Sequence, residues 1–105
     1  MIKICNRAYH KNTDTYTMSE IGIPGIVLME RAAYELVLQV PLAESKRILA
    51  VCGSGNNGGD GIAAARILHQ RGYSCDVLLL CGKHGLTELA EQELEIAKKA
   101  GVRVY

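Results

Sequence analysis

The chain has 105 residues, which limits it to one small domain. Its 12 basic and 11 acidic residues give a formal net charge of +1, so there is no basic excess for binding nucleic acid or a membrane surface. Trp and Phe are absent, and with them the usual stacking platforms for single-stranded nucleic acid. No apolar run approaches the roughly 18 residues of a membrane span, and no signal peptide is visible. These features predict a cytoplasmic protein that binds neither nucleic acid nor membranes.

The first 41 residues predict two helices. Asn6 is a suitable N-cap for a helix over residues 7–21, which Gly22 would close. Pro24 opens a second helix, in which apolar residues recur at helical spacing until Pro41 ends it.

The remainder alternates between strands and helices. Strands are expected over residues 47–52, 74–80 and 102–105, and helices from about 60 to 70 and from 86 to 100. The first strand, Arg-Ile-Leu-Ala-Val-Cys, is continuously apolar and therefore predicted to be buried on both faces, as in a parallel sheet. In the last helix Thr87 is the expected N-cap, and Glu88, Glu91 and Glu93 are interpreted as a solvated face.

This order is βαβαβ after two leading helices, and it predicts an α/β fold. The architecture would be a Rossmann-like three-layer sandwich with a parallel sheet, of which residues 1–105 supply the first half. In a sheet of order 3-2-1-4-5-6 the first strand is central. We therefore expect residues 47–52 to present an apolar, unpaired edge, and the chain to be a truncated piece of a longer domain.

A glycine-rich run, Gly53-Ser-Gly-Asn-Asn-Gly-Gly-Asp-Gly61, joins the first strand to the helix that follows. Such a loop presents backbone N–H groups and a positive helix end to a phosphate. It matches the dinucleotide pattern GxGxxG, but the next strand ends in Leu80 and Cys81, without the acid that pattern requires. A Walker loop is excluded because it needs a lysine at its end.

Two blocks of sequence resemble the YjeF N-terminal domain family, which contains the NAD(P)HX epimerases. The first is Gly53–Gly61, followed by Ala64-Ala65-Arg66-Ile67-Leu68 and Arg71-Gly72-Tyr73. The second is the run Gly-Ile-Pro-Gly-Ile-Val-Leu-Met-Glu-Arg-Ala-Ala over residues 22–33, which resembles the family's second helix. It departs at Ala33, where most members carry glycine.

The resemblance implies an isomerase that interconverts the R and S epimers of hydrated NADH and NADPH, a form of nicotinamide nucleotide repair. It implies that Asn56, Asn57, Gly58, Gly59 and Asp60 bind this substrate, and that Asn57 also binds a potassium ion. If Gly58 or Gly59 only cradles a phosphate, replacing it with valine should block binding and leave the fold largely intact.

The catalytic acid–base residue is not assigned, because the family's aspartate and further contacts lie beyond residue 105. The fragment is therefore expected to be inactive alone, and we expect it to form a homo-oligomer. Two alternatives remain open. The parent protein could carry a C-terminal ATP- or ADP-dependent NAD(P)HX dehydratase domain, or the fold could serve as a non-enzymatic interaction domain, as in RNA-decapping scaffolds.

The four cysteines have no metal-binding spacing and form no CxxC pair. Cys52 and Cys75 fall in apolar runs, where a free thiol behaves as a small hydrophobic group. We therefore expect reduced thiols in this chain, including Cys5 and Cys81.

Overall fold

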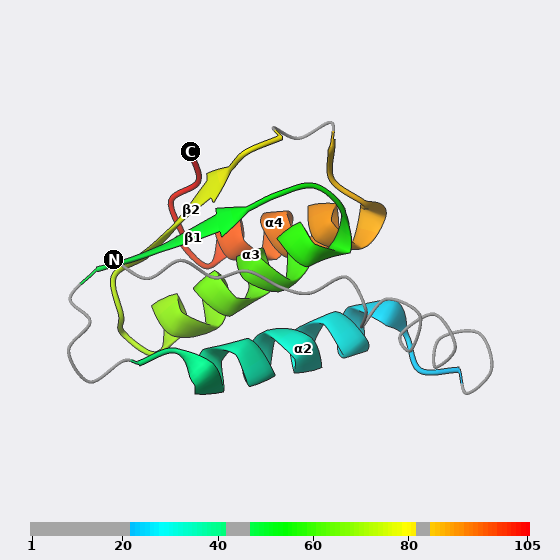
Figure 1. Ribbon diagram of the computed structural model, residues 1–105, viewed down its shortest axis with the longest axis horizontal. Coiled ribbons are helices and arrows are strands. Elements are labelled where there is room, and N and C mark those ends of the chain that lie inside the picture. Colours follow the sequence, from blue (N-terminus) through cyan, green and yellow to red (C-terminus); the bar gives the residue numbers. More distant parts are fainter. Residues whose placement is uncertain (1–21, 42–46, 82–84) are drawn as a thin grey trace.

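The computed structural model describes residues 22–41, 47–81 and 85–105. Its elements run in the order α2 (Gly25–Gln39), β1 (Ile48–Cys52), α3 (Gly55–Gln70), β2 (Cys75–Leu79) and α4 (Glu88–Lys99) (Figure 1). The helix predicted over residues 7–21 lies outside the described residues. The alternation of helix and strand confirms the predicted α/β class.

The two strands form a parallel pair. Ile48 lies opposite Cys75 at one end of the register, and Cys52 lies opposite Leu79 at the other. The expected third strand is reduced to a single parallel bridge between Val77 and Val104 on the far side of β2. The spatial order is therefore β1, β2, C-terminal residues, which agrees with the 3-2-1 order of the predicted half-sheet.

All three described helices lie on one side of this sheet, because α2 and α4 both pack on α3, which covers β1 and β2 (Figure 1). Ile48, Ala50 and Cys52 face α3 and are buried, whereas Leu49 and Val51 on the other face of β1 are only half-buried. The prediction that β1 is buried on both faces is thus wrong for the second face. The described residues contain no helix on that side of the sheet.

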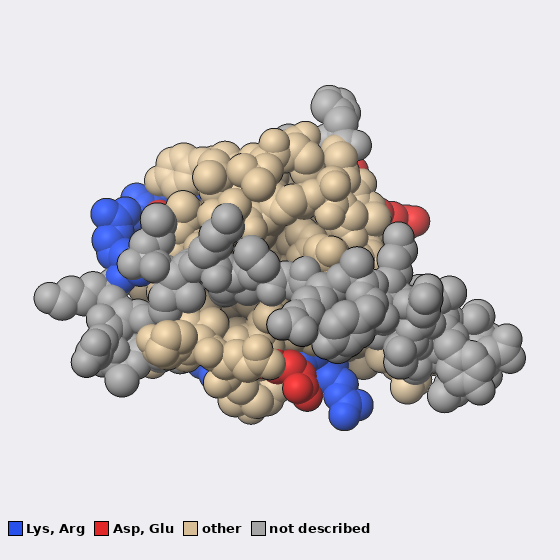
Figure 2. All heavy atoms as spheres, viewed as in Figure 1, with Lys and Arg blue, Asp and Glu red and all other residues tan. Residues whose placement is uncertain are grey.

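The second face is mostly apolar. It carries the half-buried Leu49 and Val51 on β1, and Leu80 and Tyr105 beyond them are 67% and 63% exposed. Its charged residues include the ion pair between Asp76, opposite Leu49 in the register, and Arg103. Figure 2 shows mostly uncharged residues over the part of the surface that β1 and β2 occupy in Figure 1. Among the described residues, β1 pairs along one edge only, with β2. Within the described residues, the predicted apolar edge of residues 47–52 has no second strand along Ile48–Cys52.

The helix ends follow the expected signals. The hydroxyl of Thr87 accepts a hydrogen bond from the Ala90 N–H at 3.2 Å, which confirms Thr87 as the N-cap of α4. Gly72 and Gly101 follow α3 and α4 with φ angles of +95° and +97°, values that only glycine adopts readily. In the described residues, no helix is both long enough and apolar enough to cross a membrane.

One boundary differs from the prediction. Helix α3 begins at Gly55 rather than at about Asp60, so the Asn-Asn-Gly-Gly-Asp run forms its first turns and is not a loop. Asparagine and glycine are poor helix formers, and glycine costs about 1 kcal/mol relative to alanine in a helix interior. Tertiary packing overrides this local preference.

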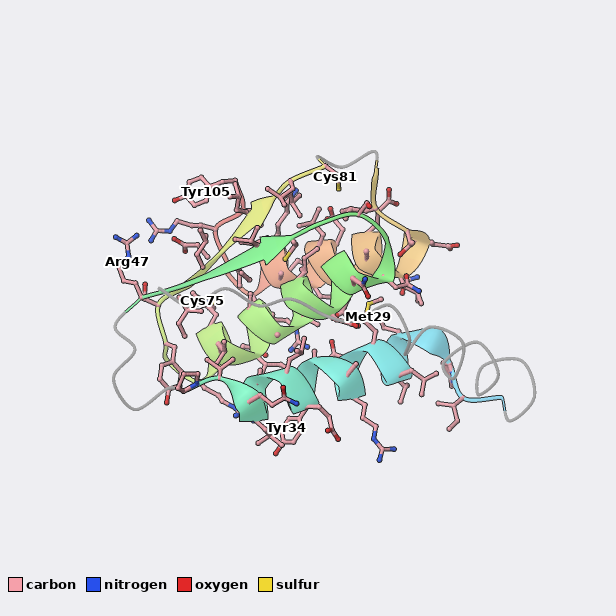
Figure 3. The ribbon with its side chains drawn as sticks, viewed as in Figure 1. Met29, Tyr34, Arg47, Cys75, Cys81 and Tyr105 are labelled. Atoms are coloured by element: carbon pink, nitrogen blue, oxygen red, sulfur yellow. The ribbon has the colours of Figure 1, made fainter. Side chains whose placement is uncertain are left out.

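Close packing explains the glycines. A Cβ atom at Gly58 would lie 2.1 Å from the carbonyl oxygen of Gly53, and one at Gly59 would lie 2.6 Å from Sδ of Met29 and 3.1 Å from Cα of Ala90. The start of α3 is therefore pressed against the end of β1, against α2 and against α4. Figure 3 shows Met29 pointing from α2 toward this turn.

The packing revises the expectation that valine at Gly58 or Gly59 would leave the fold intact. Even Gly58→Ala should lower the free energy of unfolding by about 1–3 kcal/mol, because the new methyl group meets a backbone oxygen that cannot move alone. Gly53→Ala is the matched control, since a Cβ there meets nothing within 4 Å. Urea unfolding of the two variants measures the difference, and equal midpoints would contradict this account of the turn.

The open edge of β1 predicts self-association. Sedimentation velocity of the 105-residue chain should show dimers or larger species, because an unpaired apolar strand is a template for another strand. Val51→Lys should shift the chain toward monomer by placing a charge on the open sheet face. Leu38→Lys, on an exposed position of α2, should not. A stable monomer of the unaltered chain would show that the edge is not adhesive.

Candidate functional site

The candidate site lies where β1 ends and α3 begins. In parallel α/β sheets, ligands bind at the carboxyl ends of the strands, and Cys52 is the last residue of β1. All five predicted substrate-binding residues fall in the first turns of α3. Their positions on a helix mean that they face different directions, toward solvent or toward the packed core.

The five residues divide by exposure. Asn57 is exposed and Asn56 half-buried, whereas Gly58, Gly59 and Asp60 are buried. The two glycines therefore face the protein, with their Cα atoms against Gly53 and Met29. The predicted residues do lie together, but no single exposed cradle contains all five.

The exposed part of this turn is the helix N-terminus itself. Ser54 occupies the N-cap position of α3, and its side chain makes no capping hydrogen bond. The first backbone N–H groups of α3 thus have no side-chain acceptor from the N-cap residue. These groups and the positive end of the helix dipole suit an anionic oxygen.

Asn56 is fixed by a contact that sequence reasoning missed. The Thr87 hydroxyl donates a hydrogen bond to Oδ1 of Asn56 at 2.5 Å while accepting one from the Ala90 N–H. Thr87 therefore joins the N-termini of α3 and α4. This hydrogen bond holds the Asn56 amide in one orientation, with its oxygen toward Thr87. The sequence predicts Thr87 as an N-cap, but no local pattern predicts its hydrogen bond to Asn56.

Asn57 offers an exposed amide group. An amide oxygen is a ligand that hard cations accept. Within the described ranges, no group of three or more His, Cys, Asp or Glu residues could hold a metal ion. The described residues thus supply Asn57 as one possible ligand of a larger set.

A partly buried ion pair joins α2 to α3. Both carboxylate oxygens of Glu30 on α2 accept hydrogen bonds from Nη2 of Arg66 on α3, and Nη1 of Arg66 donates to Oε1 of Gln70 at 2.7 Å. Although 38% of its side chain is exposed, Glu30 connects α2 to α3 through this pair.

The interpretation of Glu88, Glu91 and Glu93 as one solvated face of α4 is wrong for Glu93. Glu88 and Glu91 are exposed as predicted, but Glu93 is 0% exposed. It occupies the stripe of Ala90, Leu94 and Ala97, the i, i+3, i+4, i+7 pattern of a buried helix face. That spacing is the signal that sequence reasoning overlooked.

Burial is the main reason that the pKa of Glu93 rises from 4.5 to about 8. A hydrogen bond to the Glu30 side chain and the charge of Glu30 add to this rise in pKa, as does Asp60 more weakly, whereas the charge of Arg66 lowers the pKa. The folded state therefore favours the neutral form of the Glu93 carboxyl group.

Cys52, Cys75 and Cys81 form no disulfide among the described residues, as expected for reduced thiols. Burial raises the pKa of both Cys52 and Cys75 to about 12, so neither supplies a thiolate at neutral pH. Sγ of Cys52 lies 2.9 Å from where a Cβ at Gly61 would stand, another close contact between β1 and α3.

Comparison with known proteins shows the family to which the chain is related. Residues 25–105 match the family described as YjeF-related protein N-terminus. Proteins named NAD(P)H-hydrate epimerase are similar: the one from Weissella koreensis is 44% identical over 91 residues (85% of this chain, 41% of that protein), and the one from Oenococcus oeni is 42% identical over 106 residues (96% and 49%). The crystal structure of yeast ynu0, YNL200c, has a TM-score of 0.71 and 29% identity, and the match covers 98% of this chain and 46% of that one.

These relatives are longer. The chain spans about half the length of the curated relatives it matches, 41% and 49% in the two cases above. The match to the family model nevertheless includes every strand and helix described here. This chain belongs to the family of YjeF-related protein N-termini.

Proposed function

We propose that this chain is the nucleotide-holding part of an NAD(P)H-hydrate epimerase, with NADHX or NADPHX as its substrate. The observation that carries the proposal is the start of α3: a helix N-terminus at the carboxyl edge of a parallel sheet, uncapped by Ser54 and flanked by the exposed Asn57. Two relatives with at least 42% identity bear the name of that enzyme.

A phosphate of the dinucleotide would accept hydrogen bonds from the first N–H groups of α3. Gly58 and Gly59 contribute indirectly, because they let this turn approach β1, α2 and α4 closely enough to be held rigidly. Asp60 is 7% exposed, so we assign it to supporting the helix start and not to a phosphate contact, which its charge would oppose.

The proposed reaction inverts a carbon that bears both a hydroxyl group and the ring nitrogen of the hydrated nicotinamide. Such a centre can lose and regain its hydroxyl with acid–base assistance. We propose that the acid–base residue comes from sequence beyond Tyr105. The described residues then bind and orient the substrate, and the chain alone would not turn it over.

In a second version of this proposal, the parent protein also carries a dehydratase domain after the epimerase domain. The protein named bifunctional NAD(P)H-hydrate repair enzyme Nnr from Moorella thermoacetica is 41% identical over 93 residues, and the match covers 84% of this chain but 18% of that protein. A parent reading frame extending well past an epimerase domain would favour this form.

If a phosphate binds at the start of α3, a substitution there can lower the affinity for the nucleotide without lowering the stability of the fold. Ser54→Asp should keep the helix stable, since aspartate caps helices as well as serine does, but it places a negative charge where the phosphate would bind. Affinity for NADP⁺, measured by calorimetry, should fall about tenfold or more. Ser74→Asp makes the same change on an exposed residue before β2 and should leave affinity unchanged. Equal affinities for the two variants would exclude the helix N-terminus as the phosphate site.

The cation contact predicts a dependence on potassium. Asn57→Ala should weaken nucleotide binding more in potassium buffer than in potassium-free buffer, because it removes an oxygen ligand as well as an exposed amide. Gln92→Ala removes another exposed amide, on α4, and serves as the control. If the loss at Asn57 is the same in both buffers, the residue shapes the turn and binds no ion.

A further inference from the structure

Unpartnered polar atoms gather at the junction of the three helices. In the described part of the chain, the buried side-chain nitrogen and oxygen atoms without a hydrogen-bond donor or acceptor in good geometry are both carboxyl oxygens of Glu93 and Nε of Arg66. The nearby Glu30 carboxylate becomes a hydrogen-bond acceptor for Glu93 only when Glu93 carries a proton. Buried polar groups in proteins are nearly always hydrogen-bonded, so this concentration requires a reason. An ionised carboxylate without hydrogen bonds is among the least favourable groups to bury.

The acidic groups that face Glu93 make ionisation of its carboxyl group still less favourable. Glu30 approaches from α2, and Arg66 and Asp60 approach from α3. The guanidinium of Arg66 already donates to Glu30 and to Gln70, so its charge is shared. With Glu93 ionised, three carboxylates would surround one guanidinium. With Glu93 protonated, the charges of Glu30 and Arg66 balance, and one fewer carboxylate crowds the guanidinium.

The position of Glu93 connects it to the candidate site. Ala90 lies one turn earlier on α4, with its Cα 3.1 Å from the Cβ position of Gly59. The Ala90 N–H donates to Thr87, and Thr87 donates to Asn56. The first turn of α4 therefore holds the first turn of α3, and Glu93 holds the same face of α4 against α2 and α3.

We propose that Glu93 is a positioning residue whose carboxyl group must carry a proton to keep α4 seated, so that Thr87 stays on Asn56 and the start of α3 keeps its binding geometry. The effect on nucleotide affinity rests on the proposed function. The proton on Glu93 and its effect on Asn56 do not.

The sign of the pH dependence follows from the raised pKa. Between about pH 4.5 and about pH 8, the unfolded chain loses this proton while the folded chain keeps it. The stability of the folded state therefore falls as pH rises through this window. Near pH 8 the folded carboxyl ionises as well, the slope disappears, and the contact between α4 and α3 loosens.

Glu93→Gln tests the proton directly, because glutamine has the shape of the neutral acid and cannot ionise. The folding equilibrium constant of the parent should fall by up to about tenfold per pH unit relative to that of the variant, from about pH 5 to about pH 8. The infrared band of a protonated carboxyl should be present in the parent at pH 7 and absent in the variant. Glu95→Gln, an exposed residue of α4, should change neither measurement.

The opposite result would overturn the inference. If Glu93 is ionised and paired with Arg66, Glu93→Gln will destabilise the protein at neutral pH, the loss will shrink in acid, and the parent will show no such infrared band.

The effect of Glu93 on the position of Asn56 is measured separately from stability. The side-chain amide resonance of Asn56 should shift with a midpoint near pH 8 in the parent and stay constant in Glu93→Gln. A shift in both proteins, or in neither, would refute the link from Glu93 to Asn56. Affinity for NADP⁺ is measured alongside: if neither protein binds it while the Asn56 shift behaves as expected, the proposed function fails and the positioning role stands.

Discussion

The structure depends on how closely the first turns of α3 approach three other elements. Gly58 lies against the last backbone of β1, and Gly59 lies against Met29 of α2 and Ala90 of α4. A side chain at either position would separate the helix from its neighbours, because a Cβ would come within 2.1 Å of Gly53 or 2.6 Å of Met29. Glycine is normally unfavourable inside a helix. These two glycines therefore make the first turns of α3 less stable on their own, but they allow close packing against the neighbouring elements. The site is rigid because its scaffold is packed from behind.

This constraint divides the turn into an inner and an outer side. A helix presents successive residues about 100° apart, so a run of five residues cannot all face one ligand. The inner side holds the glycines and Asp60, and the outer side holds Asn57 and the uncapped N–H groups beside Ser54. Asn56 lies between them and is fixed by Thr87. Binding and packing therefore use adjacent residues of one short segment, so a change at a single residue can affect either property without the other.

Much of this arrangement was predictable from the sequence, and the exceptions have physical causes. Strong local signals located the ends of α2 and α4 and the stop of α3, since proline, threonine and glycine act within a turn of their own position. The start of α3 was missed because the helix propensity of Asn-Asn-Gly-Gly is poor and the contacts that override it come from distant segments. Glu30 and Arg66 are 36 residues apart, and no local pattern pairs them. Glu93 was misjudged because glutamate is rarely buried, although its apolar neighbours at helical spacing marked the position.

The charges behind the turn bear on which ligand the front can hold. The N-terminus of α3 offers roughly half a positive charge, concentrated at its first N–H groups. A negative charge packed behind the same turn would offset this attraction, and Glu30, Asp60 and Glu93 all lie there. Arg66 neutralises Glu30 directly, and burial raises the pKa of Glu93, which favours the uncharged form of its carboxyl group. A buried neutral carboxyl thus preserves the electropositive character of the helix start, while its shape and packing still hold α4 in place. The same acid, once ionised, would weaken both the fold and the attraction for a phosphate, so the stability of the helix junction and the electrostatics of the site respond to one proton.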